Sequence, residues 1–179
     1  MNGRMAVDPL RIFLSAEAFR VAVETLSIHY HSTAKKAVYV YPIFVNAALT
    51  SELYLKCLVA IKTPFLPKNH QLHRLFDALP KIDRATVINR YKALCNATPA
   101  HAKFFQEHPQ FKDDIRSVLE DSSEVFSKIR YAYEGLPPGT KMHAYFQLPY
   151  TAIRTVILEC HPEWPSKISP SSPPTFRLR

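Results

Sequence analysis

The densest group of chemically capable side chains lies in one short stretch that holds Arg130, Tyr131, Tyr133 and Glu134. On a helix, Arg130 and Glu134 would share one face because they are four residues apart. Arginine and tyrosine side chains together can stack on unpaired RNA bases, and an ionised glutamate can act as a general base. The alternative is an ion pair within the helix, which would contribute only a few tenths of a kcal/mol.

A second polar group interrupts the most apolar part of the chain. Asn46, Glu52 and Lys56 stand among apolar residues between positions 37 and 61. Buried polar groups need hydrogen-bonding partners, so these three either line a binding pocket or pair with one another or with Arg130. Glu52 and Lys56 are four residues apart with the glutamate first, which is the favourable order for a helical ion pair.

Little in the sequence supports a metal site, a disulfide framework or a glycine-rich nucleotide-binding loop. His70 and His73 have a spacing that could hold a metal, but no neighbouring cysteine or carboxylate completes a ligand set. We assign His70 instead to a binding surface. The alternatives are that it caps its helix or packs in the loop. The cysteines lie far apart, without a CxxC pair, which argues against a disulfide framework and a zinc knuckle. With three glycines in the whole chain, neither a Rossmann loop nor a P-loop can be present, and we expect neither a metal nor a cofactor.

The charge of the chain is basic and unevenly distributed. The formal net charge is +8, and residues 66–96 contain six Lys or Arg against two Asp. A basic protein favours acidic partners, including nucleic acid. The alternative is that the charge only keeps a small domain soluble.

Hydropathy predicts a soluble, cytoplasmic protein without a membrane partner. The first 20 residues carry several charges and no uncharged apolar core long enough for a signal peptide. Residues 37–61 contain the polar group described above, and this favours a buried core helix over a membrane span.

Apolar residues recur at helical spacing through most of the chain. We expect helices over about residues 8–31, 42–62, 71–79, 83–96, 111–133 and 149–160. A weak strand signal at residues 38–41 is left open, and residues 98–109 are expected to form a connector with one helical turn at most. The prediction is an all-α, up-and-down helical bundle of five to six helices in one domain, residues 1–162. Residues 163–179 are rich in Pro and Ser and are expected to form a disordered basic tail.

Three blocks in order resemble a known family: residues 41–59 (YPIFVNAALTSELYLKCLV), 69–80 (NHQLHRLFDALP) and 128–135 (KIRYAYEG). The first is similar to a helix of the HEPN family (higher eukaryotes and prokaryotes nucleotide-binding) that begins near a proline and continues as small–Glu–Leu–x–Leu–Lys. The second resembles the His–x–Leu–x–x–Leu–Phe segment that follows, and the third the Arg–Tyr–x–Tyr–Glu end of a later helix. The resemblance implies a bundle of four to five helices that often forms a homodimer.

The resemblance also implies a candidate active site. Many HEPN members are metal-independent ribonucleases of toxin–antitoxin or antiphage systems, with an Arg, four to six residues and then a His. Arg154 and His161 match that spacing, although Thr155 stands where many members have Asn, Asp or His. In such a site the His removes a 2′-hydroxyl proton and the Arg stabilises the phosphate. If residues 130–134 occupy the place of the catalytic motif instead, Glu134 stands where the His would be. The alternative is an exposed Arg154 and a helix-terminal His161 favoured by the helix dipole.

Three functions remain open at this point. The first is a HEPN-like module that binds RNA, nucleotide or a protein partner, in a bacterial toxin–antitoxin or antiphage setting. The second is a metal-independent endoribonuclease acting as a dimer, and the third is a purely structural interaction protein. The weak catalytic motif favours the binding module over the enzyme, and the basic segment favours both over the structural protein.

Overall fold

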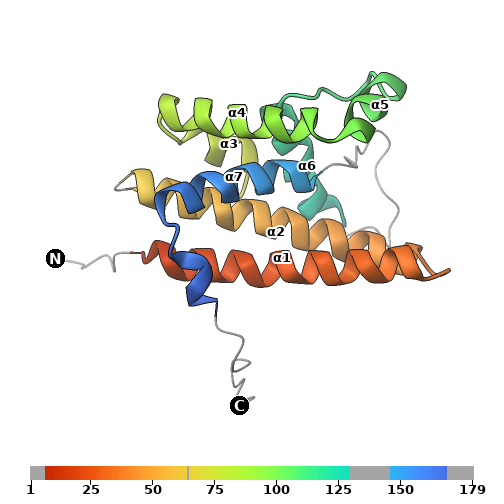
Figure 1. Cartoon of the computed structure of the whole chain (residues 1–179), viewed down its shortest axis with the longest axis horizontal. Coiled ribbons are helices and arrows are strands. Elements are labelled where there is room, and N and C mark those ends of the chain that lie inside the picture. Colours follow the sequence, from red (N-terminus) through yellow and green to blue (C-terminus); the bar gives the residue numbers. More distant parts are fainter. Residues whose placement is uncertain (1–6, 64, 130–145, 169–179) are drawn as a thin grey trace, which may run out of the picture.

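The computed structural model describes residues 7–63, 65–129 and 146–168, and in this part of the chain all regular secondary structure is helical (Figure 1). The elements are α1 (Pro9–Ser32), α2 (Ala37–Lys62), α3 (Leu72–Asp77), α4 (Lys81–Asn96), α5 (Pro99–Glu107), α6 (Ile115–Ile129), α7 (Gln147–Cys160) and the 3-10 helix η2 (Trp164–Lys167). The predicted all-α bundle is confirmed, with more helices than the five to six expected.

Helix α1 begins where the sequence predicts. The Asp8 side chain accepts a hydrogen bond from the backbone N–H of Leu10 at 3.0 Å, and Pro9 occupies the first helical turn. An acidic cap followed by a proline is a strong helix start because it satisfies one free N–H and presets the backbone. The helix ends at Ser32, one residue beyond the predicted end.

Helix α2 begins five residues earlier than predicted, and residues 38–41, where a strand was left open, are helical. Pro42 lies inside the helix instead of opening it. The backbone N–H of Tyr39 already donates to the carbonyl of Lys36 at 3.0 Å, so the first turn forms before the proline is reached. Pro42 therefore removes one helical hydrogen bond, but it does not stop a helix that is also held by packing. Val38 is 67% exposed, so the apparent alternation buries no strand face.

Helix α2 is the central element of the bundle. It is long and apolar enough to cross a membrane by length and composition, but 56% of its most apolar 18-residue window is buried inside the protein. It packs against α1, α3, α6 and α7. The predicted buried core helix is thereby confirmed, since a helix that is apolar nearly all round must be covered on several sides.

The second half of the chain departs from prediction at helix starts. Helix α4 begins at Lys81, and Asp83 does not cap it but forms an ion pair with Lys62 of α2 at 3.0 Å. The expected connector contains α5, whose first residue is Pro99; a proline is preset for that position. Helix α6 begins at Ile115, four residues later than the predicted start. The carboxylate of Asp114, just before the helix, accepts a hydrogen bond from the backbone N–H of Ser117 at 2.9 Å.

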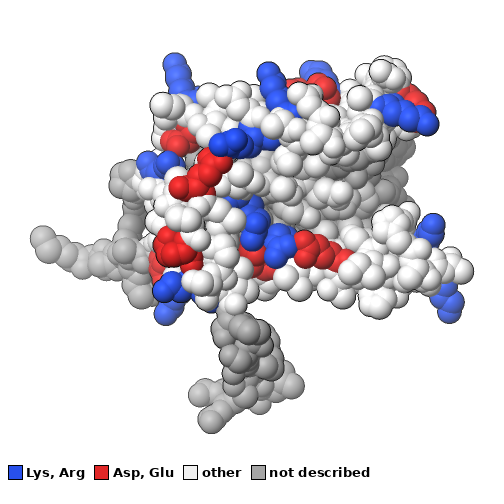
Figure 2. All heavy atoms as spheres, in the orientation of Figure 1, with Lys and Arg blue, Asp and Glu red and all other residues white. Residues whose placement is uncertain are grey.

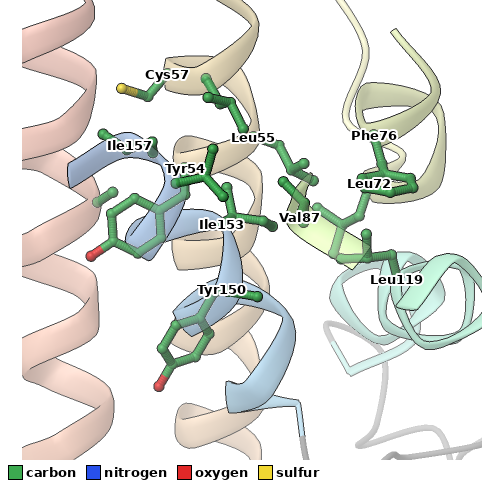
Figure 3. Packing of buried hydrophobic residues seen from close by; sticks show 14 of the residues in the cluster. Tyr54, Leu55, Cys57, Leu72, Phe76, Val87, Leu119, Tyr150, Ile153 and Ile157 are labelled. Atoms are coloured by element: carbon green, nitrogen blue, oxygen red, sulfur yellow. The ribbon is translucent and has the colours of Figure 1, made fainter. Parts of the chain in front are cut away.

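Helix α7 contributes Tyr150, Ile153 and Ile157 to the hydrophobic core (Figure 3). It packs against α2 on one side and α4 on the other. Ile153 and Ile157 are completely buried, together with Tyr54 and Leu55 of α2. The helix expected over residues 149–160 therefore supplies the centre of the core.

The ordered fold continues past the predicted end of the domain. Trp164, in η2, is only 6% exposed, and its ring lies 5.2 Å from that of Phe13 in α1. A large aromatic side chain buries much apolar surface, which explains why this segment docks despite its prolines. Residues 169–179 lie outside the described residues.

Candidate functional site

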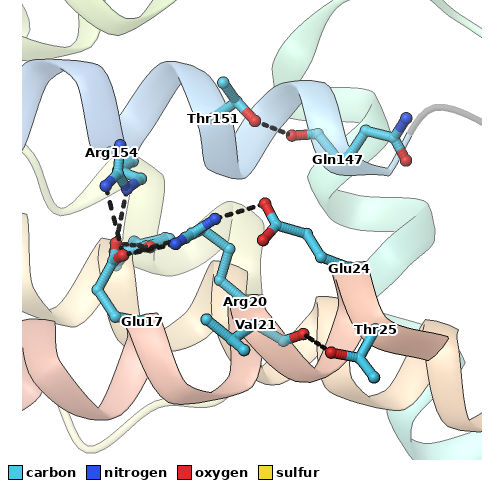
Figure 4. Close-up of polar contacts among 9 residues, drawn as sticks. Glu17, Arg20, Val21, Glu24, Thr25, Gln147, Thr151 and Arg154 are labelled. Atoms are coloured by element: carbon cyan, nitrogen blue, oxygen red, sulfur yellow. Dashed lines mark hydrogen bonds and ion pairs between the residues drawn. The ribbon is translucent and has the colours of Figure 1, made fainter. Parts of the chain in front are cut away.

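Arg154 lies on the face of α7 that looks toward α1 (Figure 4). Its Nε is 2.6 Å from Oε1 of Glu17, and its second guanidinium nitrogen is 3.3 Å from Oε2. The side chain is 27% exposed, whereas that of Glu17 is 2% exposed. The sequence places these residues 137 positions apart, and they meet because α1 and α7 both pack against α2.

Glu17 collects hydrogen bonds from three helices. Arg20, one turn along α1, approaches Oε2 at 2.9 Å, and the hydroxyl of Tyr54 in α2 donates to Oε1. Arg20 also pairs with Glu24. We call Glu17, Arg20, Glu24, Tyr54 and Arg154 the Glu17 cluster. Its two arginines and two glutamates balance in formal charge.

The cluster holds Glu17 in its ionised form. Burial by itself would raise the pKa of Glu17, but the hydrogen bonds from Arg154, Tyr54 and Arg20 outweigh it, and the pKa is lowered. Burial and the bond to Glu17 raise the pKa of Tyr54, so its hydroxyl remains a donor. Each charged side chain of the cluster, and the Tyr54 hydroxyl, thus has a hydrogen-bond or ion-pair partner inside the cluster, as buried charges require.

His161 has a separate environment from Arg154. It follows the last residue of α7, and its ring stacks on that of Trp164 with centroids 4.1 Å apart. Its Nδ1 lies 3.4 Å from a carboxylate oxygen of Glu163. Within the described residues, Arg154 and His161 share no hydrogen-bond partner, so the structure of one chain does not assemble them into one site.

The other predicted site of chemistry cannot be placed in the fold. Arg130, Tyr131, Tyr133 and Glu134 lie outside the described residues. The stacking surface and the ion pair suggested for them stay predictions.

The polar group on α2 divides into two parts. Glu52 accepts from Lys56 at 2.7 Å and lies 2.9 Å from Nδ1 of the exposed His70. Asn46 instead donates to the carbonyl of Pro42 at 2.7 Å. Of the alternatives open from the sequence, the pairing of Glu52 with Lys56 is observed, and His70 joins them. In the described part of the chain, no three His, Cys, Asp or Glu side chains gather at a metal-binding geometry.

The basic segment at residues 66–96 contains two kinds of cation. Arg84 and Arg90 reach acidic side chains, at 3.7 Å from Asp77 and 2.7 Å from Glu159 respectively. The exposed cations without an acidic partner in the described residues are Lys68, Arg74, Lys81 and Lys92. Basic side chains project along the upper edge of the molecule, over α4 (Figure 2). We call Lys68, Arg74, Lys81 and Lys92 the unpaired cations.

A cavity of about 730 Å³ runs along α4, between this helix, the end of α3 and residues 113–116. We call it the α4 groove. Phe76, Ile88 and Ile115 are among its apolar lining residues, and Lys81 and Lys92 also line it. Its volume lies in the range of small-molecule sites, which combine apolar walls with a few polar groups.

Tyr91 is the most unusual group in the α4 groove. The residue is 2% exposed, and its hydroxyl has no nitrogen or oxygen partner within the described residues. The Cys95 thiol, one turn along α4, is a side-chain hydrogen-bond partner of Tyr91, but sulfur is a weak acceptor. Burial, Cys95 and the nearby carboxylates of Asp113 and Asp114 raise the pKa of Tyr91. A buried donor is thus left without a strong acceptor.

Comparison of the chain with family models, with curated proteins and with solved structures gives no match. The function of the site is therefore inferred from its own geometry.

Sequence reasoning missed Glu17, Tyr54 and the special position of Tyr91. Glu17 could have been noticed, because it follows the buried Phe13 by four residues and so falls on the buried face of α1. Tyr91 lies within the helix expected over residues 83–96, and it is buried. No signal in the sequence shows which groups surround its hydroxyl, because that depends on how the helices pack.

Proposed function

We propose that the chain is a HEPN-like helical module that binds RNA or nucleotide through the basic surface of α3 and α4. The observation that carries the proposal is the set of unpaired cations. A lysine or arginine already paired with a carboxylate contributes little to phosphate binding, whereas an exposed unpaired one can replace the counterions of a phosphate. Four such exposed side chains lie within residues 66–96.

The resemblance of residues 41–59 and 69–80 to HEPN sequences supports the same interpretation. In this structure the two blocks form α2 and α3, which pack against each other. A toxin–antitoxin or antiphage setting, a homodimer and a protein partner follow from the resemblance alone and are part of the proposal.

The metal-independent endoribonuclease is the second candidate. Arg154 is a weak choice for its catalytic arginine, because the guanidinium is already bound to Glu17 through two nitrogens. An arginine that stabilises a phosphate must be free to approach it. Residues 130–134, with Arg130 and Glu134, are therefore the better place to look for catalysis.

The binding proposal is tested by titrating labelled single-stranded RNA with the full chain at several salt concentrations. A double variant, Lys81→Ala with Lys92→Ala, should bind more weakly and lower the salt slope by roughly 0.7 for each phosphate that is no longer neutralised. The matched control is Lys35→Ala with Lys36→Ala, which removes the same charge at the exposed α1–α2 turn. Equally weakened binding in both double variants would mean that net charge alone matters, and the proposal would fail.

The enzyme hypothesis is tested by incubating RNA with the protein in EDTA. Cleavage that is abolished in Arg130→Ala, with the fold intact by circular dichroism, would identify a metal-independent ribonuclease. Cleavage that is abolished only in Arg154→Ala would require a check of stability, because that side chain also holds α7 on α1.

A further inference from the structure

The turn between α1 and α2 is flanked by a group of exposed apolar side chains. Ile28, near the end of α1, is 68% exposed, and Val38, in the first turn of α2, is 67% exposed. Tyr41, further along α2, is 39% exposed. We call residues 28–41 the α1–α2 tip. Single exposed apolar residues are ordinary, but a group of them on one part of the surface marks an interaction site.

These side chains lie close to the end of the helix pair. Ile28 is four residues before the last residue of α1, Ser32, and Tyr41 is four residues after the first residue of α2, Ala37. At 1.5 Å per residue, both lie within about 6 Å of those helix ends, measured along the helix axes. The turn projects at one end of the molecule (Figure 1), so an extended surface that meets this end contacts both helices at once.

The α1–α2 tip is also basic. No Asp or Glu occurs between Glu24 and Glu52, and Lys35 and Lys36 are both exposed. On the face shown in Figure 2, the basic side chains at this end of the molecule have no acidic side chain beside them. Apolar and cationic groups together complement a partner that offers both hydrocarbon and anions. An anionic membrane surface has this chemistry.

The tyrosine rings of the tip distinguish a membrane from RNA. The Nζ atom of Lys36 lies 5.6 Å from the ring centroid of Tyr30, and the ring of Tyr39 stacks on that of His29 with centroids 6.0 Å apart. Both tyrosines also pack against the core. Single-stranded RNA needs open aromatic faces on which its bases can stack, and these rings already have neighbours. Amphipathic tyrosines do suit the membrane–water interface, so the tip favours lipid.

We propose that the α1–α2 tip binds end-on to the surface of an anionic membrane. Ile28, Val38 and Tyr41 enter the boundary between headgroups and acyl chains, where peripheral elements bury their apolar side chains by about 5–10 Å. Lys35 and Lys36 stay at the lipid phosphates, because long basic side chains keep their charge in the polar layer.

The proposed contact is peripheral and separate from the RNA surface. Only the beginning of α2 reaches lipid, and its buried residues from Ile43 onward stay in the bundle. Hydropathy, which predicts no membrane partner, detects spanning segments and is insensitive to a contact of this kind. The unpaired cations lie on other elements, within residues 66–96. Membrane binding and RNA binding can therefore be lost separately.

The experiment measures co-sedimentation of the full chain with vesicles of phosphatidylcholine mixed with phosphatidylserine, and with vesicles of phosphatidylcholine alone. Wild type should bind the first and not the second, and it should bind more weakly as salt screens the charges. Lys35→Ala with Lys36→Ala should weaken binding roughly fivefold for each lysine. Ile28→Ser with Val38→Ser should weaken it roughly tenfold, because less apolar surface leaves water.

Each double variant has a matched control outside the tip. Val7→Ser with Ile82→Ser changes the same two residue types at positions that are 50% and 77% exposed. Lys112→Ala with Lys167→Ala removes the same charge at two other exposed positions. Both controls should bind vesicles as wild type does, and thermal unfolding of every variant shows that the protein tested is folded.

Several outcomes would overturn the inference and leave the proposed function standing. These are no binding of wild type to the mixed vesicles, equal binding to both kinds of vesicle, and equal losses in the tip variants and their controls. If wild type ignored vesicles and Ile28→Ser with Val38→Ser abolished self-association in sedimentation velocity, the tip would be a contact between two copies of the chain. RNA binding that required Lys35 and Lys36, without vesicle binding, would assign the tip to RNA instead.

Discussion

The Glu17 cluster and the α4 groove are both polar regions of the same bundle, but they differ in how many of their polar groups have hydrogen-bond or ion-pair partners. In the cluster, one buried carboxylate accepts from two arginines and a tyrosine on three helices. In the groove, the hydroxyl of the buried Tyr91 has no nitrogen or oxygen partner within the described residues, and Lys81 and Lys92 have no acidic partner there. The difference distinguishes a region whose polar groups are paired with one another from one whose polar groups are not.

The Glu17 cluster acts as a clamp between α1, α2 and α7. Removing one member of a buried ion cluster leaves the others desolvated without a partner, and this is more damaging than the net strength of the interaction suggests. This role also explains why Arg154 is a poor catalytic arginine. A side chain that holds two helices together cannot be released to a substrate without loosening them.

Glu17→Gln is expected to have the largest effect on stability. The substitution keeps the shape but removes the charge that two arginines and Tyr54 share, and it should lower the free energy of unfolding by about 3–5 kcal/mol. The measurement is urea denaturation followed by circular dichroism. Glu24→Gln, at a side chain that is 55% exposed, is the matched control and should change stability far less. Equal effects would show that the cluster is no clamp.

The contribution of Glu17 should depend on pH with a defined sign. Its pKa is lowered in the folded protein from an ordinary value of 4.5, so the unfolded chain takes up the proton first as the pH falls. The stability that ionised Glu17 contributes is therefore complete above about pH 4.5 and is lost as the pH falls through the folded-state pKa. The difference in unfolding free energy between wild type and Glu17→Gln, measured from pH 7 to 3, should shrink only in the acid range. A difference that grew on acidification would contradict the lowered pKa.

Two buried tyrosines offer the most direct comparison of the regions. Tyr54→Phe removes a hydrogen bond to a carboxylate and should lower stability by about 1.5–3 kcal/mol. Tyr91→Phe removes a hydroxyl that has no strong partner in the described residues, and it should leave stability within about 0.5 kcal/mol of wild type or raise it. Both variants keep the ring, so packing is unchanged, and thermal or urea unfolding decides. If Tyr91→Phe proved as damaging as Tyr54→Phe, its hydroxyl would have a structural role.

The unpaired lysines should have the smallest effect on folding. Lys81→Ala and Lys92→Ala alter exposed positions on α4 and should change unfolding free energy by less than about 0.5 kcal/mol each. Their effect should appear in RNA binding instead. A clear loss of stability in either variant would mean that these side chains serve the fold, and the comparison between the two regions would be weakened.

Part of the fold is predictable from the sequence because local signals agree with packing. Asp8 and Pro9 mark the start of α1, and the apolar face of α7 with Ile153 and Ile157 predicts its place in the core. Helix starts are mispredicted where one residue can take either of two structural roles. Pro42 can open a helix or lie inside one, and Asp83 can cap a helix or pair with Lys62 across to α2. Such choices depend on neighbours that are distant in the chain.

By itself, the sequence determined the fold class, the central place of α2 and the basic character of residues 66–96, because helical periodicity and charge are local properties. Only the tertiary structure decided which polar groups satisfy one another. It placed Arg154 on Glu17 and directed His161 to Trp164, and among the described residues it left the Tyr91 hydroxyl without a strong partner in the α4 groove. Hydrogen-bond partners are set by the packing of helices far apart in the chain, and spacing along one helix cannot specify them.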